Sequence, residues 1–191
     1  DQLIFSVCDQ SDDGIKVEEI GFRNQIHYEH VDPLFSKGPC WARHRAQNFF
    51  NNEDYFLQID SHTQFAPNWD VTFIDQLSKI SSLKSDDQYF NKPVITSYPR
   101  GFEVIDFEKG QFGLHMEDKF TQVIMYRKDS LFSSGSFSRQ IGMPTKSENI
   151  THAILMAAGC IFTNGSFVKE IPYDPNYYFY GEELSMALRA F

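Results

Sequence analysis

The sequence has few cysteines, and none of them form a motif. Its 191 residues include three, Cys8, Cys40 and Cys160, which lie far apart. Because there is no C-x-x-C pair, neither a zinc ribbon nor a dithiol redox motif is expected. Isolated thiols fit a reducing compartment, so we expect a cytoplasmic protein, with one disulfide plus a free thiol as the alternative.

Long apolar runs and excess positive charge are also missing. No stretch is apolar over enough residues to span a bilayer, and no signal-peptide pattern is present. Lysine and arginine number 17 against 26 acidic residues, which gives a formal net charge of −9. Nucleic acids and anionic membranes bind basic patches, so neither is an expected partner. A phosphorylated ligand stays compatible with this charge, because a bound divalent cation reverses the local field.

Aromatic side chains, in contrast, are abundant, at 16% of the sequence with 19 Phe and 9 Tyr. A core rich in phenylalanine is the favoured interpretation, and stacking on carbohydrate is the alternative. A chain of this length fits one domain with a substantial core. It begins at Asp1 directly before an apolar strand pattern and ends at Phe191 within an amphipathic helix pattern. We therefore expect residues 1–191 to be a fragment of one domain.

Strand and helix patterns alternate through the first half of the chain. The expected strands cover residues 3–9, 24–31, 55–60 and 93–99, and the expected helices cover 40–50, 67–80 and the residues after Gly181. Residues 100–150 are expected to be loops with edge strands, and 152–171 a strand, a turn and a short helix. The apolar run "YFLQI" predicts a strand buried on both faces of a parallel sheet. This alternation indicates an α/β fold.

The stretch "QIDSHTQFAPNWD" (58–70) places two metal-capable side chains directly after an apolar strand. In open α/β sheets, ligands bind beyond the carboxyl ends of the strands, which is where Asp60 is expected. A carboxylate and an imidazole two residues apart can converge on one cation if the chain turns at once. Such an oxygen and nitrogen pair suits manganese better than calcium. A polar turn or cap is the alternative for Asp60 and His62.

Two further segments carry charged candidates. The stretch "GEEL" (181–184) puts Glu182 and Glu183 at a helix start, where the helix dipole favours carboxylates. A role toward a sugar hydroxyl or an acceptor is an equal alternative for them. Arg43 lies on the helix that precedes the strand carrying Asp60. A solvated arginine is the default interpretation there, and a phosphate or uracil contact is the sharper hypothesis.

Several of these stretches together resemble one family. "GPCWARHRAQNFFNNEDYFLQIDSHTQFAPNWD", "AAGCIFTNGSFVKEIPYDP" and "YYFYGEELSMALRAF" resemble the polypeptide hydroxyproline α-N-acetylglucosaminyltransferases and their microbial relatives. The same order of motifs is more distantly similar to polypeptide N-acetylgalactosaminyltransferases. The resemblance spans nearly the whole chain and is strongest over residues 38–70 and 157–191.

This resemblance implies a GT-A fold, a Rossmann-like mixed sheet flanked by helices, in which D-x-H takes the place of the D-x-D motif. Asp60 and His62 would then hold Mn²⁺ or Mg²⁺ at the diphosphate of a UDP-sugar. Arg43, Asp60 and Ser61 would contact the nucleotide-sugar, and Glu182 and Glu183 would act near the donor sugar or the acceptor hydroxyl. The implied activity is a retaining, UDP-GlcNAc-dependent hexosyl transfer to hydroxyproline of a protein or to a glycan.

Two departures from the family pattern bear on activity. The family has one more strand and turn before the equivalent of "LIFSVCD", and a further metal-ligating histidine beyond the "GEE" helix. Neither is present in this sequence. A sugar- or nucleotide-binding module with the same fold and no turnover is therefore the alternative function. A metal-dependent hydrolase that uses Asp60 and His62 is a third, disfavoured because no further ligand or base accompanies them.

Overall fold

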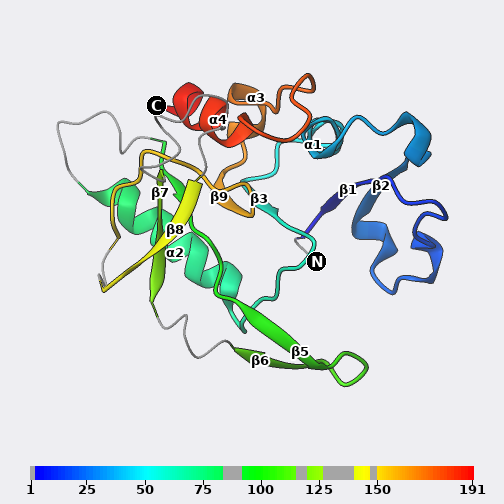
Figure 1. Ribbon diagram of the computed structural model, residues 1–191, viewed down its shortest axis with the longest axis horizontal. Coiled ribbons are helices and arrows are strands. Elements are labelled where there is room, and N and C mark those ends of the chain that lie inside the picture. Colours follow the sequence, from blue (N-terminus) through cyan, green and yellow to red (C-terminus); the bar gives the residue numbers. More distant parts are fainter. Residues whose placement is uncertain (1–2, 84–91, 115–119, 127–139, 147–149) are drawn as a thin grey trace. The chain divides into compact units, whose positions relative to one another are not determined.

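A computed structural model describes residues 3–83, 92–114, 120–126, 140–146 and 150–191 of the chain (Figure 1). The chain divides into two compact units. Unit 1 comprises Asp1–Asp54 and Gly165–Ala190, and unit 2 comprises Tyr55–Asn164 with Phe191. Each unit is described separately below, because the predicted functional residues are distributed over both.

Unit 1 begins with a parallel pair of strands. Strand β1 (Phe5–Asp9) pairs with β2 (Ile26–His30). The segment between them contains two short 3-10 helices, η1 (Val17–Glu19) and η2 (Arg23–Gln25). A third, η3 (Pro33–Phe35), follows β2. Both strands fall inside the predicted ranges 3–9 and 24–31, and their parallel pairing requires the long connection that the sequence supplies.

Three helices complete unit 1. Helix α1 (Pro39–Gln47) follows Gly38, whose φ of 89° is a conformation that favours glycine, and Pro39 occupies its first turn. Helices α3 (Phe167–Glu170) and α4 (Glu182–Ala190) come from the carboxyl-terminal segment. The core of the unit combines side chains from all three helices and from the loop before α4. These are Cys40, Ala42, Phe167, Val168, Tyr173, Met186 and Ala187.

The central sheet of unit 2 has three strands in the order β3-β9-β4. Strand β9 (Cys160–Asn164) is antiparallel to both β3 (Tyr55–Ile59) and β4 (Val94–Thr96). Helix α2 (Trp69–Ser82) buries Leu77 and Ile80, and its Phe73 ring stacks on Phe162 of β9 at 4.9 Å. The helix begins two residues after the predicted Pro67.

The prediction for "YFLQI" was wrong in two respects, the direction of its partner strand and the extent of its burial. Residues 55–59 form a strand as expected, but its partner β9 is antiparallel, and within β3 only Gln58 is buried. The buried strand of this sheet is β9, which lies between its two neighbours and has four of its five residues buried. An apolar run indicates a strand, but its neighbours in the sheet decide how far it is buried.

Two hairpins supply the remaining strands of unit 2. One pairs β5 (Phe102–Asp106) with β6 (Gln111–Leu114), and the other pairs β7 (Thr121–Tyr126) with β8 (Gln140–Thr145). The prediction of loops with edge strands over 100–150 is confirmed where the structure describes that range. Its residues 115–119, 127–139 and 147–149 lie outside the described residues.

The mixed α/β class is therefore confirmed. A Rossmann-like sheet of the GT-A type is not shown: the strands of the described residues form one sheet of three strands and three of two. In the part of the chain that the structure covers, none of the helices has the length and apolarity that crossing a bilayer requires.

The two segments of unit 1 meet closely at Gly165, which lies against the backbone of Glu53 and Asp54. A Cβ atom at this position would clash with the backbone oxygen of Glu53, and the Gly165 amide donates to the Asp54 carbonyl at 2.8 Å. Because backbone atoms cannot move aside, Gly165→Ala is expected to lower the free energy of unfolding by about 3 kcal/mol. Urea unfolding measures it. Gly21→Ala is the matched control, since no atom lies within 4 Å of the added methyl; equal stability of the two variants would contradict the prediction.

Candidate functional site

Asp60 directly follows β3, at an edge where three strand ends meet. Ile59 pairs with Cys160, the first residue of β9, and Thr96, the last residue of β4, pairs with Ile161. The carboxyl ends of β3 and β4 therefore lie at the same edge as the amino end of β9. The sheet is antiparallel, yet Asp60 still lies at a carboxyl-terminal strand end, as the sequence predicts.

The segment before β9 is fixed from both neighbouring strands. The Gln58 side-chain amide donates to the Ala158 carbonyl at 2.6 Å, and the Ala157 amide donates to the Thr96 hydroxyl at 2.8 Å. Ala157 and Ala158 are both buried. These contacts tie the backbone of Ala157 and Ala158 to β3 and β4, directly before Gly159.

Gly159 lets the Asp60 carboxylate lie against that backbone. A Cβ atom on Gly159 would be 2.7 Å from Oδ2 of Asp60, which is closer than real Cβ contacts permit. The glycine therefore forms a cradle that any larger residue would fill. Asp60 is half-buried, whereas Ser61 and His62 are exposed in the turn that follows.

The Asp60–His62 turn offers a carboxylate oxygen and an imidazole nitrogen, the donor types that suit Mn²⁺. The half-buried carboxylate in its glycine cradle and the exposed imidazole two residues later fit a divalent cation that keeps part of its coordination for ligands or water. Among the residues that the structure describes, no group of three or more His, Cys, Asp and Glu side chains comes together as a metal site. Asp60 and His62 thus remain a predicted pair of ligands.

Gly159→Ala tests the cradle. The clashing atom is the end of a side chain rather than backbone, so the variant is expected to fold, with a stability loss of no more than about 1 kcal/mol. The Asp60 carboxylate must move, however. If Asp60 and His62 hold a cation at the UDP-sugar, as the sequence resemblance implies, Mn²⁺-dependent UDP affinity is expected to fall about 10-fold. Calorimetric titration measures it. Gly113→Ala, where the new methyl meets only the ends of side chains, Glu103 at 3.1 Å and Ile105 at 3.3 Å, serves as control. If the UDP affinity of Gly159→Ala were unchanged, the position of Asp60 against Gly159 would have no role in binding.

Unit 1 brings Arg43 together with Glu182. Nη1 of Arg43 lies 3.9 Å from Oε1 of Glu182, and the two side chains are 21% and 8% exposed. Arg43 also lies against Tyr173, with Nη1 3.4 Å from the hydroxyl oxygen. Glu183, in the same helical turn as Glu182, is half-buried. Two of the predicted residues of this unit are therefore in contact, and Tyr173 contacts one of them, Arg43.

Cys40 lies in the same cluster. Burial, reinforced by the charge of Glu182 and opposed by Arg43, raises the pKa of the Cys40 thiol to about 12. Its Sγ donates to the Phe179 carbonyl at 3.7 Å. A thiol held protonated in this way is a poor nucleophile, so Cys40 has a packing role.

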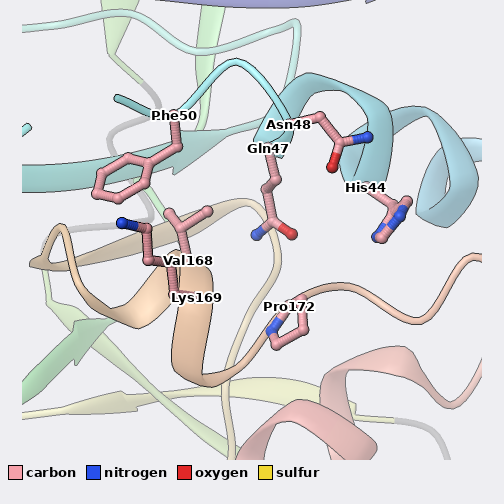
Figure 2. Close-up of a pocket in the computed structure, with 7 residues that line it drawn as sticks. All are labelled: His44, Gln47, Asn48, Phe50, Val168, Lys169 and Pro172. Atoms are coloured by element: carbon pink, nitrogen blue, oxygen red, sulfur yellow. The ribbon is translucent and has the colours of Figure 1, made fainter. Parts of the chain in front are cut away.

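Two hollows in unit 1 are lined by other residues. The one in Figure 2 has a volume of about 300 Å³ and is lined from α1, α3 and the segments that follow them by His44, Gln47, Asn48, Phe50, Val168, Lys169 and Pro172. The other, of about 520 Å³, adjoins η3 and is lined by Glu29, Val31, Leu34, Phe35, Ser36, Lys37, Trp41 and Arg45. Neither contains a residue predicted for the donor or the metal.

Sequence reasoning missed Tyr173. The signal that could have found it is the "YDP" motif, which stands in one of the stretches that carry the family resemblance. Its contacts with α1 join residues about 130 positions apart in the chain, such as the hydrogen bond to Arg43 at a separation of 130. No local pattern encodes a contact of that range.

By its elements the chain is a mixed α/β protein with a carboxylate and imidazole turn at a strand end. A family model described as Glycosyltransferase (GlcNAc) matches residues 2–191, so the chain belongs to this glycosyltransferase family. Neither a curated protein nor a solved structure matches it. Membership confirms the part of the resemblance that concerns N-acetylglucosamine transfer, and it implies a sugar donor and an acceptor. The hydroxyproline-specific family remains a prediction.

Proposed function

We propose that the chain is the transferase domain of an enzyme that moves N-acetylglucosamine from UDP-GlcNAc to a hydroxyl group, with retention at the sugar carbon. Family membership over residues 2–191 carries this proposal. The acceptor class that we propose is hydroxyproline in a protein or a glycan hydroxyl. We further propose a GT-A arrangement and a cytoplasmic location, which follow from the sequence resemblance and the unpaired thiols.

The donor diphosphate is proposed to meet Asp60 and His62 through Mn²⁺ or Mg²⁺. When bound, such a cation stabilises the charge that develops on the departing UDP. Asp60 would supply a carboxylate whose direction is set by the Gly159 backbone. His62, exposed in the turn, would supply the imidazole, and Ser61 between them would contact the nucleotide-sugar.

The remaining roles fall to α1 and α4. Arg43 is proposed to bind the nucleotide part of the donor, because a guanidinium presents donors in the geometry that phosphate oxygens accept. Glu182 and Glu183 are proposed to act at the donor sugar or the acceptor hydroxyl, where negative charge favours an oxocarbenium-like centre. The contact of Glu182 with Arg43 supports the proposal that these two residues act in the same part of the site.

A donor screen tests the proposal. The protein is incubated with Mn²⁺ and each of several UDP-sugars, and release of UDP is measured. We expect slow hydrolysis of UDP-GlcNAc in preference to UDP-glucose and UDP-GalNAc, with no release after chelation of the cation. Binding of UDP without turnover of any sugar nucleotide would favour the alternative, a sugar- or nucleotide-binding module with the same fold. Turnover that persists without cation would contradict the metal requirement.

A further inference from the structure

We propose that Tyr173 is a positioning residue for Arg43: its side chain sets the direction of the guanidinium before any ligand binds. The proposal rests on the proposed function only where it assigns UDP to Arg43. The contacts themselves lie within unit 1 and join the loop after α3 to α1.

The side chain of Tyr173 contacts Arg43 in two ways. Its hydroxyl oxygen is 3.4 Å from Nη1 of Arg43, and the guanidinium carbon lies 5.6 Å from the centre of its ring. An aromatic face attracts a cation, and a hydroxyl oxygen accepts from it, so both contacts favour the same placement. Tyr173 is only 1% exposed, so its ring has no room to turn away.

The backbone of Tyr173 is held by α1 as well. Nδ1 of His44 donates to the Tyr173 carbonyl at 2.8 Å, and the Tyr173 amide donates to Oε1 of Gln47 at 2.9 Å. Figure 2 shows His44 and Gln47 extending from α1 toward the segment that contains Pro172. Helix α1 therefore holds Tyr173 through these two side chains, and Tyr173 in turn holds Arg43 of the same helix.

Glu182 supplies a second contact for the guanidinium. Its Oε1 lies 3.9 Å from the same Nη1 atom, and Glu182 is itself buried. An arginine that contacts both a phenol and a carboxylate has lost most of its rotamers before a ligand arrives. Because binding then orders less of the side chain, affinity for an anionic group increases.

The hydroxyl is the part of Tyr173 that packing alone does not require. A phenylalanine would fill the same buried volume and keep both backbone hydrogen bonds, since these use the main-chain amide and carbonyl. Tyr173→Phe therefore separates positioning from folding. Tyr55→Phe is the matched control, because Tyr55 is exposed and packs its ring on Phe162.

Two measurements on the full chain test the proposal. The first is the side-chain Nε–H signal of Arg43 by ¹⁵N NMR, identified by its loss in Arg43→Lys. In Tyr173→Phe we expect this signal to shift and to show greater mobility, with an unchanged melting midpoint. The second is UDP affinity with Mn²⁺, which is expected to fall about 3- to 10-fold in Tyr173→Phe. In the Arg43→Ala variant, adding Tyr173→Phe is expected to cause no further loss of affinity, because the side chain that Tyr173 positions is already missing.

An unchanged Arg43 signal would overturn the proposal, and so would an equal loss of affinity in the Arg43→Ala background. If the unaltered protein bound no UDP, the proposed function would fail while the NMR signal still decided the positioning role. Gln47→Leu, which removes the acceptor for the Tyr173 amide, provides a second variant should Tyr173→Phe not fold. It is expected to shift the Arg43 signal in the same sense but by less.

Discussion

His62→Ala is expected to abolish cation-dependent binding of UDP. The proposed ligands are Asp60 and His62, so removal of the imidazole leaves only the Asp60 carboxylate of this pair to hold the cation. We expect the affinity for UDP in the presence of Mn²⁺ to fall at least about 100-fold, because the loss of a direct ligand should exceed that of an outer-shell contact. The weak affinity measured without cation should stay unchanged. Calorimetric titration with and without chelator measures both.

The control for this prediction is His152→Ala, which removes an exposed histidine of the same unit. Folding should be unaffected in both variants, since His62 is exposed in a turn. If UDP affinity with Mn²⁺ were the same in His62→Ala as in the unaltered protein, the metal assignment would be wrong. The D-x-H triplet would then be the polar turn that its local sequence also permits.

Local patterns predicted most of the secondary structure. Within residues 152–171, the expected strand is β9 and the expected short helix after the turn is α3. The expected helix after Gly181 is α4, which begins at Glu182. Apolar spacing, turn residues and acidic residues at helix starts are all local, and each acts within a few positions. Boundaries still differed by a few residues, as at α1, which ends at Gln47 rather than residue 50.

The pairing of strands could not be predicted in the same way. The sequence of β3 gives no sign that β9, a hundred residues later, is its antiparallel partner, because register depends on tertiary packing. The candidate site shows the same division. Asp60 and His62 were found from their place after a strand. The contact of Asp60 with Gly159 and the contact of Arg43 with Tyr173, in contrast, join residues that are about 100 or more positions apart in the sequence.

Glu182→Gln and Glu183→Gln are expected to lower sugar transfer far more than UDP binding. Both carboxylates are proposed to act near the sugar or the acceptor, so the loss of either charge should reduce turnover about 100-fold or more. Their effects on stability should differ. Glu182 is only 7% exposed and 3.9 Å from Arg43, so its neutralisation removes a buried negative charge that faces the guanidinium. We expect the free energy of unfolding to fall by about 2 kcal/mol in Glu182→Gln and by little in Glu183→Gln.

Turnover of UDP-GlcNAc, UDP affinity and urea unfolding, measured on the same preparations, separate these effects. Glu18→Gln removes an exposed carboxylate of the same unit and controls for net charge. UDP affinity that fell in step with turnover would move the glutamates to nucleotide binding. If Glu182→Gln lost stability but kept full turnover, the role of Glu182 would be limited to holding Arg43 in place. Glu183 carries the same charge as Glu182 but is less buried. A comparison of the two variants therefore shows whether each carboxylate contributes to turnover, and whether Glu182 alone also holds Arg43 in place.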